Sequence, residues 1–167
     1  MSVAVRAVEM LAVKPTSKVL DVGAGVGKLC LVGAAVTNSM WYGIERDAEM
    51  VRVANVAAAR MHVDQRTIFL HGDVTSLDWS MFDAFYLFNP FGELLWGPDD
   101  ALARREQYVA LVELVEDQLS RCAAGTRVVT YHGFGGHLPR GFDLVHREPA
   151  REDELCLWIR RRSRRKE

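Results

Sequence analysis

The fold is decided at Val19-Leu20-Asp21-Val22-Gly23-Ala24-Gly25-Val26-Gly27-Lys28, where an apolar run meets an acid and then three glycines. The pattern predicts a strand, a turn and the start of a helix. Glycine lacks a Cβ, so it accepts positive φ angles and lets a ligand approach the backbone closely. The helix that follows aims its free N–H groups at the same turn. The stretch therefore predicts a turn that binds a nucleotide-like molecule.

The spacing of the glycines narrows the choice of ligand. A dinucleotide-binding turn has the pattern Gly-x-Gly-x-x-Gly, whereas here the third glycine comes one residue earlier, as Gly23-x-Gly25-x-Gly27. Asp21 also stands at the end of the strand, where a carboxylate would repel a pyrophosphate but attract a ligand with ammonium and sulfonium groups. An NAD-dependent oxidoreductase is therefore the weakest of the candidate functions.

The pattern Asp-x-Gly-x-Gly-x-Gly at 21–27 resembles the first motif of the class I S-adenosylmethionine (SAM) dependent methyltransferases. The resemblance implies SAM as cofactor, S-adenosylhomocysteine as product, and an acid that orients the amino end of SAM. It also implies an α/β, Rossmann-like methyltransferase fold with a seven-stranded, mostly parallel sheet in the order 3-2-1-4-5-7-6 and helices on both faces. The cofactor-binding residues that it implies at this motif are Asp21, Gly23, Ala24, Gly25 and Gly27.

Apolar residues alternate between short runs and helical spacing along the chain, which is typical of a parallel α/β sheet. Strands are expected at 18–22, 41–44, 67–70, 84–88, 127–131, 142–147 and 155–159, and helices at 2–12, 27–36, 48–61 and 101–121. Asp99 and Asp100 are expected to cap the last helix. Its apolar side should hold Val109, Val112, Val115 and Leu119. One crossover helix of the family is then shortened or missing.

The second predicted strand ends at Glu45. An acid at this strand tip accepts hydrogen bonds from two ribose hydroxyls, as in other nucleoside-binding α/β folds. We therefore place Glu45 and its neighbour Arg46 in the predicted cofactor site. The structural alternative is that Asp47 caps the next helix and Glu45 only interacts with the helix dipole.

After the third predicted strand, Gly72-Asp73-Val74 resembles the adenine-binding motif of the family. The resemblance implies that the Asp73 carboxylate accepts a hydrogen bond from the adenine amino group, and that Val74 packs against the ring. The alternative is a tight turn in which Asp73 caps a short helix.

The turn Asn89-Pro90-Phe91 follows the fourth predicted strand, where ligands gather in open parallel sheets. It resembles the Asn-Pro-Pro-aromatic motif of methyltransferases that act on amino nitrogens, although Phe91 stands where the second proline would be. The resemblance implies that all three residues are catalytic, with Asn89 orienting the acceptor and touching the cofactor, and Phe91 shaping the pocket. The motifs together are also similar to those of class I-fold histone lysine methyltransferases. The alternative is a proline-stabilised turn without catalytic function.

Two histidines in the loop after the fifth predicted strand, His132 and His137, could reach the same site and act as a base. The segments 91–100 and 133–141 are candidates for a lid or a substrate wall. The three cysteines have neither metal-ligand nor disulfide spacing, so they are expected to be buried thiols, and no metal site is expected.

Length and charge set the remaining expectations. The 167 residues suit one domain, expected at 1–160, with a basic tail at 161–167. Six of the 21 basic residues lie between 160 and 166, so residues 1–159 have a net charge of −6, and nucleic acid is a possible but not a favoured partner. No signal peptide or membrane-spanning run is evident, which predicts a cytoplasmic protein without a membrane partner.

Together these patterns predict a SAM-dependent methyltransferase that acts on nitrogen or oxygen of a small molecule or a protein side chain. The methyl acceptor is not identified, and a protein partner or a homodimer is possible. Two alternatives stay open. One is a non-catalytic SAM-binding subunit that needs a partner, and the other is an RNA or DNA methyltransferase that uses the basic tail.

Overall fold

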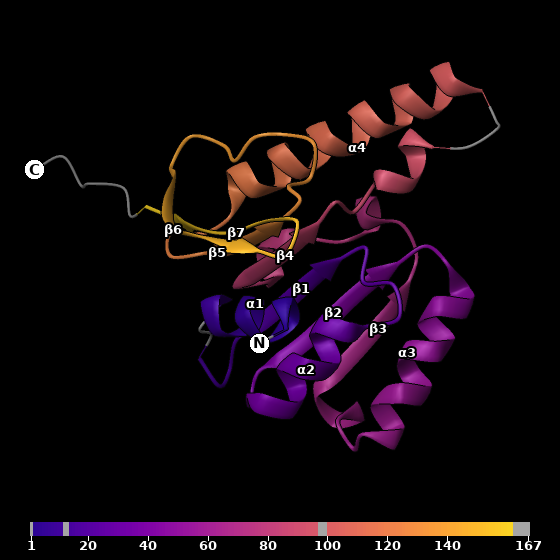
Figure 1. The fold of residues 1–167 in the computed structure, drawn as a ribbon, viewed down its shortest axis with the longest axis vertical. Coiled ribbons are helices and arrows are strands. Elements are labelled where there is room, and N and C mark those ends of the chain that lie inside the picture. Colours follow the sequence, from indigo (N-terminus) through magenta and orange to yellow (C-terminus); the bar gives the residue numbers. More distant parts are fainter. Residues whose placement is uncertain (1, 12–13, 97–99, 162–167) are drawn as a thin grey trace, which may run out of the picture.

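The computed structural model describes residues 2–11, 14–96 and 100–161 and contains one seven-stranded sheet (Figure 1). Its strands are β1 (Lys18–Val22), β2 (Met40–Glu45), β3 (Thr67–His71), β4 (Ala84–Phe88), β5 (Arg127–Tyr131), β6 (Phe142–Ala150) and β7 (Asp153–Arg160). The strand order is β3-β2-β1-β4-β5-β7-β6. β1 to β5 are parallel, and β7 is antiparallel to both of its neighbours. The predicted fold class and strand order are confirmed.

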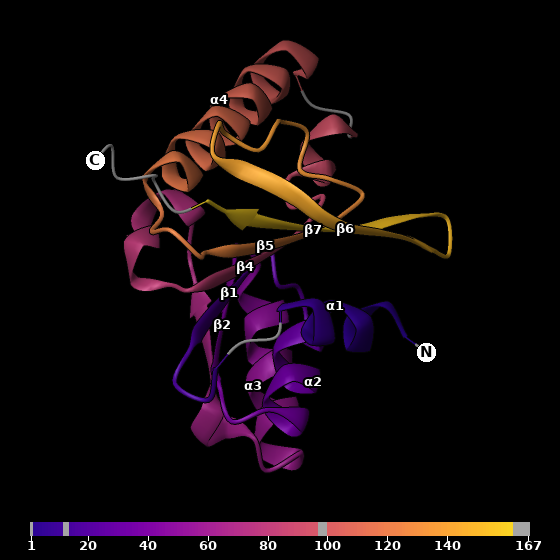
Figure 2. The same ribbon diagram turned by 90° about the vertical axis from the view of Figure 1, so that its left-hand side faces the viewer.

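Helices cover both faces of the sheet. They are α1 (Val3–Leu11), α2 (Lys28–Val36), α3 (Ala48–Arg60) and α4 (Ala101–Arg121). Figure 2 shows α1, α2 and α3 on one face and α4 on the other. Among the helices in the described ranges, none has both the length and the apolar character that a bilayer crossing requires. Ala12, Asp99 and the basic tail beyond residue 161 lie outside the described residues.

The connection from β3 to β4 contains only two short 3₁₀ helices, at Val74–Ser76 and Trp79–Met81. The expectation of a shortened crossover helix is therefore confirmed. The three cysteines are free and buried, which is also as predicted.

Side-chain alternation along the parallel strands divides the core into two parts. On β1, Leu20 and Val22 pack with the apolar residues under α4, whereas Val19 packs with those under α1 and α2. Asp21 has the same parity as Val19, so it belongs to the α1–α2 face. Tyr86 on β4 and Tyr131 on β5 also join the core on that face. One acid and several aromatic residues therefore share one face near the carboxyl ends of three strands.

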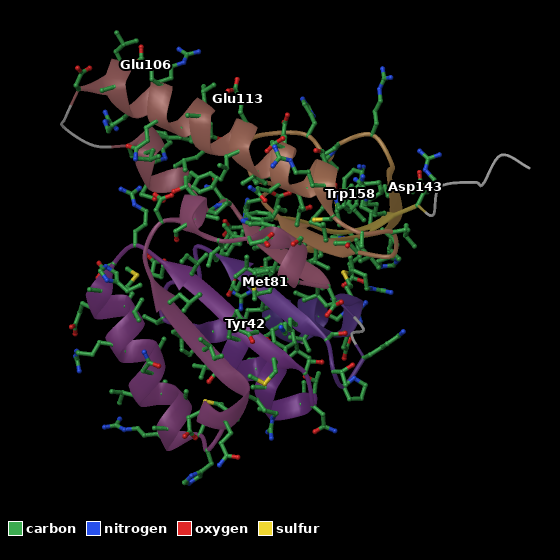
Figure 3. The ribbon with its side chains drawn as sticks, turned by 180° about the vertical axis from the view of Figure 1, so that it is seen from behind. Tyr42, Met81, Glu106, Glu113, Asp143 and Trp158 are labelled. Carbon is green, nitrogen blue, oxygen red and sulfur yellow. The ribbon has the colours of Figure 1, made fainter. Side chains whose placement is uncertain are left out.

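The buried side of α4 differs from the predicted one at a single position. Val112, Val115 and Leu119 are buried together with Leu111, but Val109 is 45% exposed. The prediction for Val109 is wrong because Leu111 shifts the buried stripe around the helix and leaves Val109 outside it. Figure 3 shows Glu106 and Glu113 on the outer side of α4, and Trp158 of β7 near the same helix.

Gly33 lets α2 lie directly on β2. A Cβ at Gly33 would lie 2.2 Å from Cε2 of Trp41, whose side chain is fully buried. No side chain larger than hydrogen fits at this contact, so the position of α2, and of the turn that precedes it, depends on this glycine.

We expect Gly33→Ala to lower the free energy of unfolding by about 1–3 kcal/mol, since the added methyl group overpacks the contact with Trp41. Urea unfolding followed by circular dichroism measures the change. Ala35→Ser, at an exposed position of the same helix, is the control and should change stability by less than about 0.5 kcal/mol. Equal midpoints for the wild type and Gly33→Ala would contradict the packing argument.

Candidate active site

The loop between β1 and α2 has the backbone conformation that its glycines predict. Gly23, Gly25 and Gly27 have φ angles of +74°, +54° and +78°. A Cβ at Gly27 would lie 2.5 Å from the ring of Phe69, so this glycine serves the packing of the loop on β3. At Gly25 a Cβ would meet only the Met50 sulfur, at 4.0 Å, so this part of the loop faces open space.

Glu45 fastens the glycine loop to the tip of β2. Its Oε2 accepts a hydrogen bond from the Gly25 N–H at 2.9 Å, and its Oε1 accepts one from the Asp47 N–H at 2.9 Å. Asp47 caps α3 through the N–H groups of Glu49 and Met50, so the predicted cap is present as well. A carboxylate has about four acceptor positions, and Glu45 is half-buried, so it can still accept from a ligand.

Asp21 is a buried acid without a cation beside it. Its side chain is 4% exposed and forms no ion pair within the described residues, and its Oδ2 accepts a long hydrogen bond from the Cys30 thiol at 4.0 Å. Burial raises the pKa of Asp21 to about 7, and the negative charge of Glu45 adds to the effect. Burying a carboxylate without a partner is costly, so the site suits a ligand that brings a positive group.

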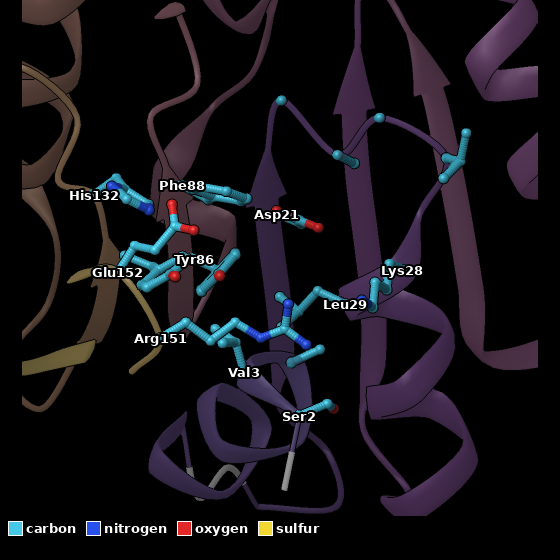
Figure 4. Close-up of a pocket in the computed structure, with 16 residues that line it drawn as sticks. Ser2, Val3, Asp21, Lys28, Leu29, Tyr86, Phe88, His132, Arg151 and Glu152 are labelled. Carbon is cyan, nitrogen blue, oxygen red and sulfur yellow. The ribbon is translucent and has the colours of Figure 1, made fainter. Parts of the chain in front are cut away.

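A cavity of about 540 Å³ opens beside Asp21 (Figure 4). This volume is in the range of small-molecule sites. Six parts of the chain line it: the start of α1, the end of β1, the β1–α2 loop with the first turn of α2, the ends of β4 and β5, and the β6–β7 turn. The lining residues outside the loop are Ser2, Val3, Ala4, Asp21, Lys28, Leu29, Tyr86, Phe88, Tyr131, His132, Arg151 and Glu152.

A second, much smaller hollow of about 30 Å³ lies on the other side of the glycine loop. It is lined by Gly23, Ile44, Glu45, Arg46, Gly72, Asp73 and Val74. Gly23 also lines the large cavity, so one continuous edge of the sheet holds both. The acids predicted at three strand tips therefore lie along one edge, Asp21 in the large cavity and Glu45 and Asp73 in the small one.

Asp73 caps a short helix, which was the alternative to adenine binding that the sequence left open. Its Oδ1 accepts a hydrogen bond from the Thr75 N–H at 2.9 Å and so caps the 3₁₀ helix at Val74–Ser76. Val74 is buried. An adenine-binding role for these two residues stays a prediction, and the second carboxylate oxygen of Asp73 is the atom that would accept from a base.

The turn Asn89-Pro90-Phe91 lines neither the cavity nor the small hollow. The Asn89 amide lies against its own turn, since a Cβ at Gly92 would lie 2.3 Å from Asn89 Nδ2. Pro90 packs on Gly23, and Phe91 is buried in the core under α4. The catalytic roles of these three residues stay predictions, and their placement favours the alternative of a proline-stabilised turn.

The aromatic wall of the cavity was not predicted from the sequence. Tyr86 and Phe88 alternate on β4 and face the same side as Tyr131, and this regular spacing was the signal that could have shown them. Arg151 and Glu152 have no such signal, because they reach the cavity only through the β6–β7 hairpin. Of the two histidines considered, His132 lines the cavity and His137 does not.

The raised pKa of Asp21 predicts a pH effect on stability. Between about pH 4 and pH 7 the folded protein keeps a proton on Asp21 that the unfolded chain has already released, so the free energy of unfolding falls as pH rises. We expect Asp21→Asn to remove a decrease on the order of 3–4 kcal/mol across this range, since one extra bound proton changes the free energy by about 1.4 kcal/mol per pH unit. Urea unfolding at a series of pH values measures it. Asp64→Asn, at an exposed acid, should keep the wild-type dependence, and parallel curves for wild type and Asp21→Asn would refute the assignment.

Comparisons with known proteins agree with this geometry. A family model described as a methyltransferase domain matches residues 19–113. An RNA methyltransferase from Salinibacter ruber, solved with S-adenosyl-L-homocysteine, is similar over 99% of this chain and 94% of its own, at 20% identity and a TM-score of 0.72. TrmN from Thermus thermophilus is similar over 94% of this chain and 48% of its own, at 18% identity and a TM-score of 0.67. 

A SAM-dependent methyltransferase from Thiobacillus denitrificans, also solved with S-adenosyl-L-homocysteine, is similar over 76% of this chain and 46% of its own, at 16% identity and a TM-score of 0.55. This chain thus spans about half the length of two of these three proteins. No curated protein sequence gives a match. The narrower similarity to histone lysine methyltransferases stays a prediction. Since the family model covers more than half of its residues, the chain belongs to the methyltransferase domain family and has the fold of the class I SAM-dependent enzymes.

Proposed function

We propose that this protein binds SAM at the β1–α2 loop and transfers its methyl group to an acceptor in the adjoining cavity. The observation that carries the proposal is the buried Asp21 carboxylate, which has no cation beside it and lines a cavity of about 540 Å³ next to a loop of positive-φ glycines. A ligand with an ammonium group provides the missing positive charge.

The methionine part of the ligand is assigned to the large cavity. Asp21 accepts hydrogen bonds from its ammonium group, and the open face at Gly25 lets it lie against the backbone. Lys28 and Arg151 line the same cavity. These two cations are the side chains available to the ligand carboxylate.

The adenosine part is assigned to the edge beyond the glycine loop. Glu45 accepts from the ribose hydroxyls while it holds the loop through the Gly25 N–H. Asp73 and Val74 flank the adenine, and Arg46 lines the same hollow. The hollow has a volume of only about 30 Å³, so the base lies mostly on the surface of the protein.

When bound, SAM supplies an activated methyl group on a positively charged sulfur. The chain's own task is to align the acceptor with that group and to exclude water. The β6–β7 hairpin and α1 wall the cavity together, because Glu148 accepts two hydrogen bonds from Arg6, Nε to Oε1 at 2.8 Å and Nη2 to Oε2 at 2.6 Å. Figure 2 shows the hairpin turn and the start of α1 projecting on the same side of the molecule.

Two alternatives are separated by experiment. A non-catalytic SAM-binding subunit would bind SAM in calorimetry without forming S-adenosylhomocysteine with any acceptor until a partner protein is added. An RNA or DNA methyltransferase would bind nucleic acid with an affinity that falls steeply with salt. The net charge of −6 over residues 1–159 gives a small-molecule or protein acceptor more support than a nucleic acid.

We expect Glu45→Ala to weaken SAM binding by about 1–3 kcal/mol, which is roughly 5- to 150-fold in Kd, because both ribose hydroxyls lose their acceptor. Gly25→Val should abolish binding, since its side chain enters the space of the ligand at a position where a Cβ would meet only the Met50 sulfur, at 4.0 Å. Isothermal titration calorimetry measures both. Glu49→Ala removes an acid on the exposed surface of α3 and should bind SAM normally. Unchanged affinity in both site variants would refute the site.

SAM affinity should rise with pH up to about pH 7 and then level off. The ligand ammonium favours ionised Asp21, so binding below pH 7 releases the proton that burial keeps on this carboxyl. Calorimetry in two buffers with different ionisation enthalpies detects the released proton directly. Asp21→Asn should bind weakly and without this pH dependence. Proton uptake instead of release would contradict the assigned role of Asp21.

A further inference from the structure

His132 lies at the tip of β5 with a carboxylate held on one of its two ring nitrogens. Its Nδ1 is 2.7 Å from Oδ2 of Asp153, the first residue of β7. Because β7 runs antiparallel to β5, its start lies at the same edge of the sheet as the end of β5. A carboxylate that accepts from Nδ1–H leaves the lone pair of Nε2 free. Within the described part of the chain, no hydrogen bond to Nε2 is formed.

The same cavity holds an aromatic wall next to His132. The Phe88 ring stacks on the His132 ring with centroids 5.5 Å apart and an interplanar angle of 25°, and it also contacts the Tyr131 ring at 5.0 Å. Phe88 is nevertheless 50% exposed, so part of an apolar ring is open to the cavity (Figure 4). An exposed aromatic face in a ligand cavity suits a planar, apolar ligand.

The side chain that would orient an amine lies elsewhere. The Asn89 amide packs against its own turn, and Asn89 does not line the cavity. An imidazole and a carboxylate, those of His132 and Glu152, line the cavity beside the aromatic wall. A base beside the acceptor is needed when the acceptor must lose a proton before it attacks, which applies to a hydroxyl and not to a neutral amine.

We propose that His132, oriented by Asp153, is the general base for methylation of an aromatic hydroxyl group, a phenol or a hydroxylated heteroaromatic ring, that stacks against Phe88. The proposal rests on the proposed function, since SAM supplies the methyl group. Asp153 acts through His132 and is a positioning residue.

Nε2 of His132 takes the proton of the acceptor hydroxyl, and the acceptor oxygen forms a bond to the methyl carbon. The carbon–sulfur bond breaks, and its electron pair stays on the sulfur, which becomes neutral. Asp153 stabilises the imidazolium that results, and the proton leaves His132 to solvent through the open side of the cavity.

Paired probes test the acceptor class. 1-Naphthol and 1-naphthylamine differ only in the hydroxyl and the amino group, and transfer of a tritiated methyl group from SAM measures the reaction of each. We expect 1-naphthol to be methylated on oxygen and 1-naphthylamine to react at least tenfold more slowly. SAM binding without naphthol methylation, or faster methylation of the amine or of an RNA oligonucleotide, would overturn this acceptor class while leaving the proposed function intact. Absence of SAM binding would instead refute the proposed function.

Variants test the role of each side chain. His132→Gln should lower kcat with 1-naphthol about 100-fold or more, with the Kd for SAM unchanged within about twofold. Asp153→Asn should lower kcat more than it raises KM, because the wrong tautomer is favoured. The matched control is His146→Gln, since His146 also pairs with a carboxylate, Glu148, on the same hairpin but does not line the cavity. Loss of activity in the control equal to that in His132→Gln would refute the assignment.

The pH profile identifies which group is the base. The titratable or charged groups near His132 are Asp153, Glu152, Arg151 and Tyr131. At saturating SAM, kcat/KM of the wild type for 1-naphthol should rise with pH along a limb that is absent in His132→Gln and present in Glu152→Gln. Loss of the limb in Glu152→Gln instead would make Glu152 the base and refute the proposal.

A binding measurement serves as a readout without turnover. With S-adenosylhomocysteine bound, 1-naphthol should shift the ring signals of His132 in NMR spectra and leave those of His146 unchanged. An unchanged His132 signal at saturating 1-naphthol would overturn the proposed contact.

Discussion

The buried carboxyl group of Asp21 is the feature on which the candidate site depends, because burial disfavours its charged form. The strand that carries it is the centre of a parallel sheet, so hydrogen-bonded neighbours on both sides fix its position. Within the described residues no cation offsets the charge, and burial raises its pKa to about 7. A cationic ligand would offset the cost of burying this carboxylate. Asp21 is therefore the strongest single indicator of such a ligand.

The glycine loop is held from two directions. Ile44 accepts hydrogen bonds from the N–H groups of Gly23 and Ala24, both at 3.0 Å, and Glu45 accepts from Gly25. The tip of β2 therefore fixes the shape of the loop that follows β1. The acid proposed for the ribose is also a structural support of the loop proposed for the methionine part, which couples the two halves of the proposed SAM site.

The antiparallel hairpin completes the site at the other end of the sheet. Its turn brings Arg151 and Glu152 to the cavity, and the first residue of β7 meets His132. The ion pair between Arg6 and Glu148 ties the hairpin to α1, so two segments distant in the sequence form one wall. The last two strands thus line the cavity as well as closing the sheet.

By itself, the sequence determined the glycine loop and the acids at three strand tips, because these follow from local spacing and from the rule that parallel strands end at one edge of a sheet. The strand order came from the resemblance of its motifs to those of the class I methyltransferases. The sequence did not determine which of those side chains reach a cavity. The Asn89 amide packs against its own turn, and Phe91 is buried in the core. His132 contacts Phe88 and Asp153 because β4, β5 and β7 pack side by side. Only the tertiary structure decided this, since the direction of a side chain at a strand tip depends on contacts with residues far away in the sequence.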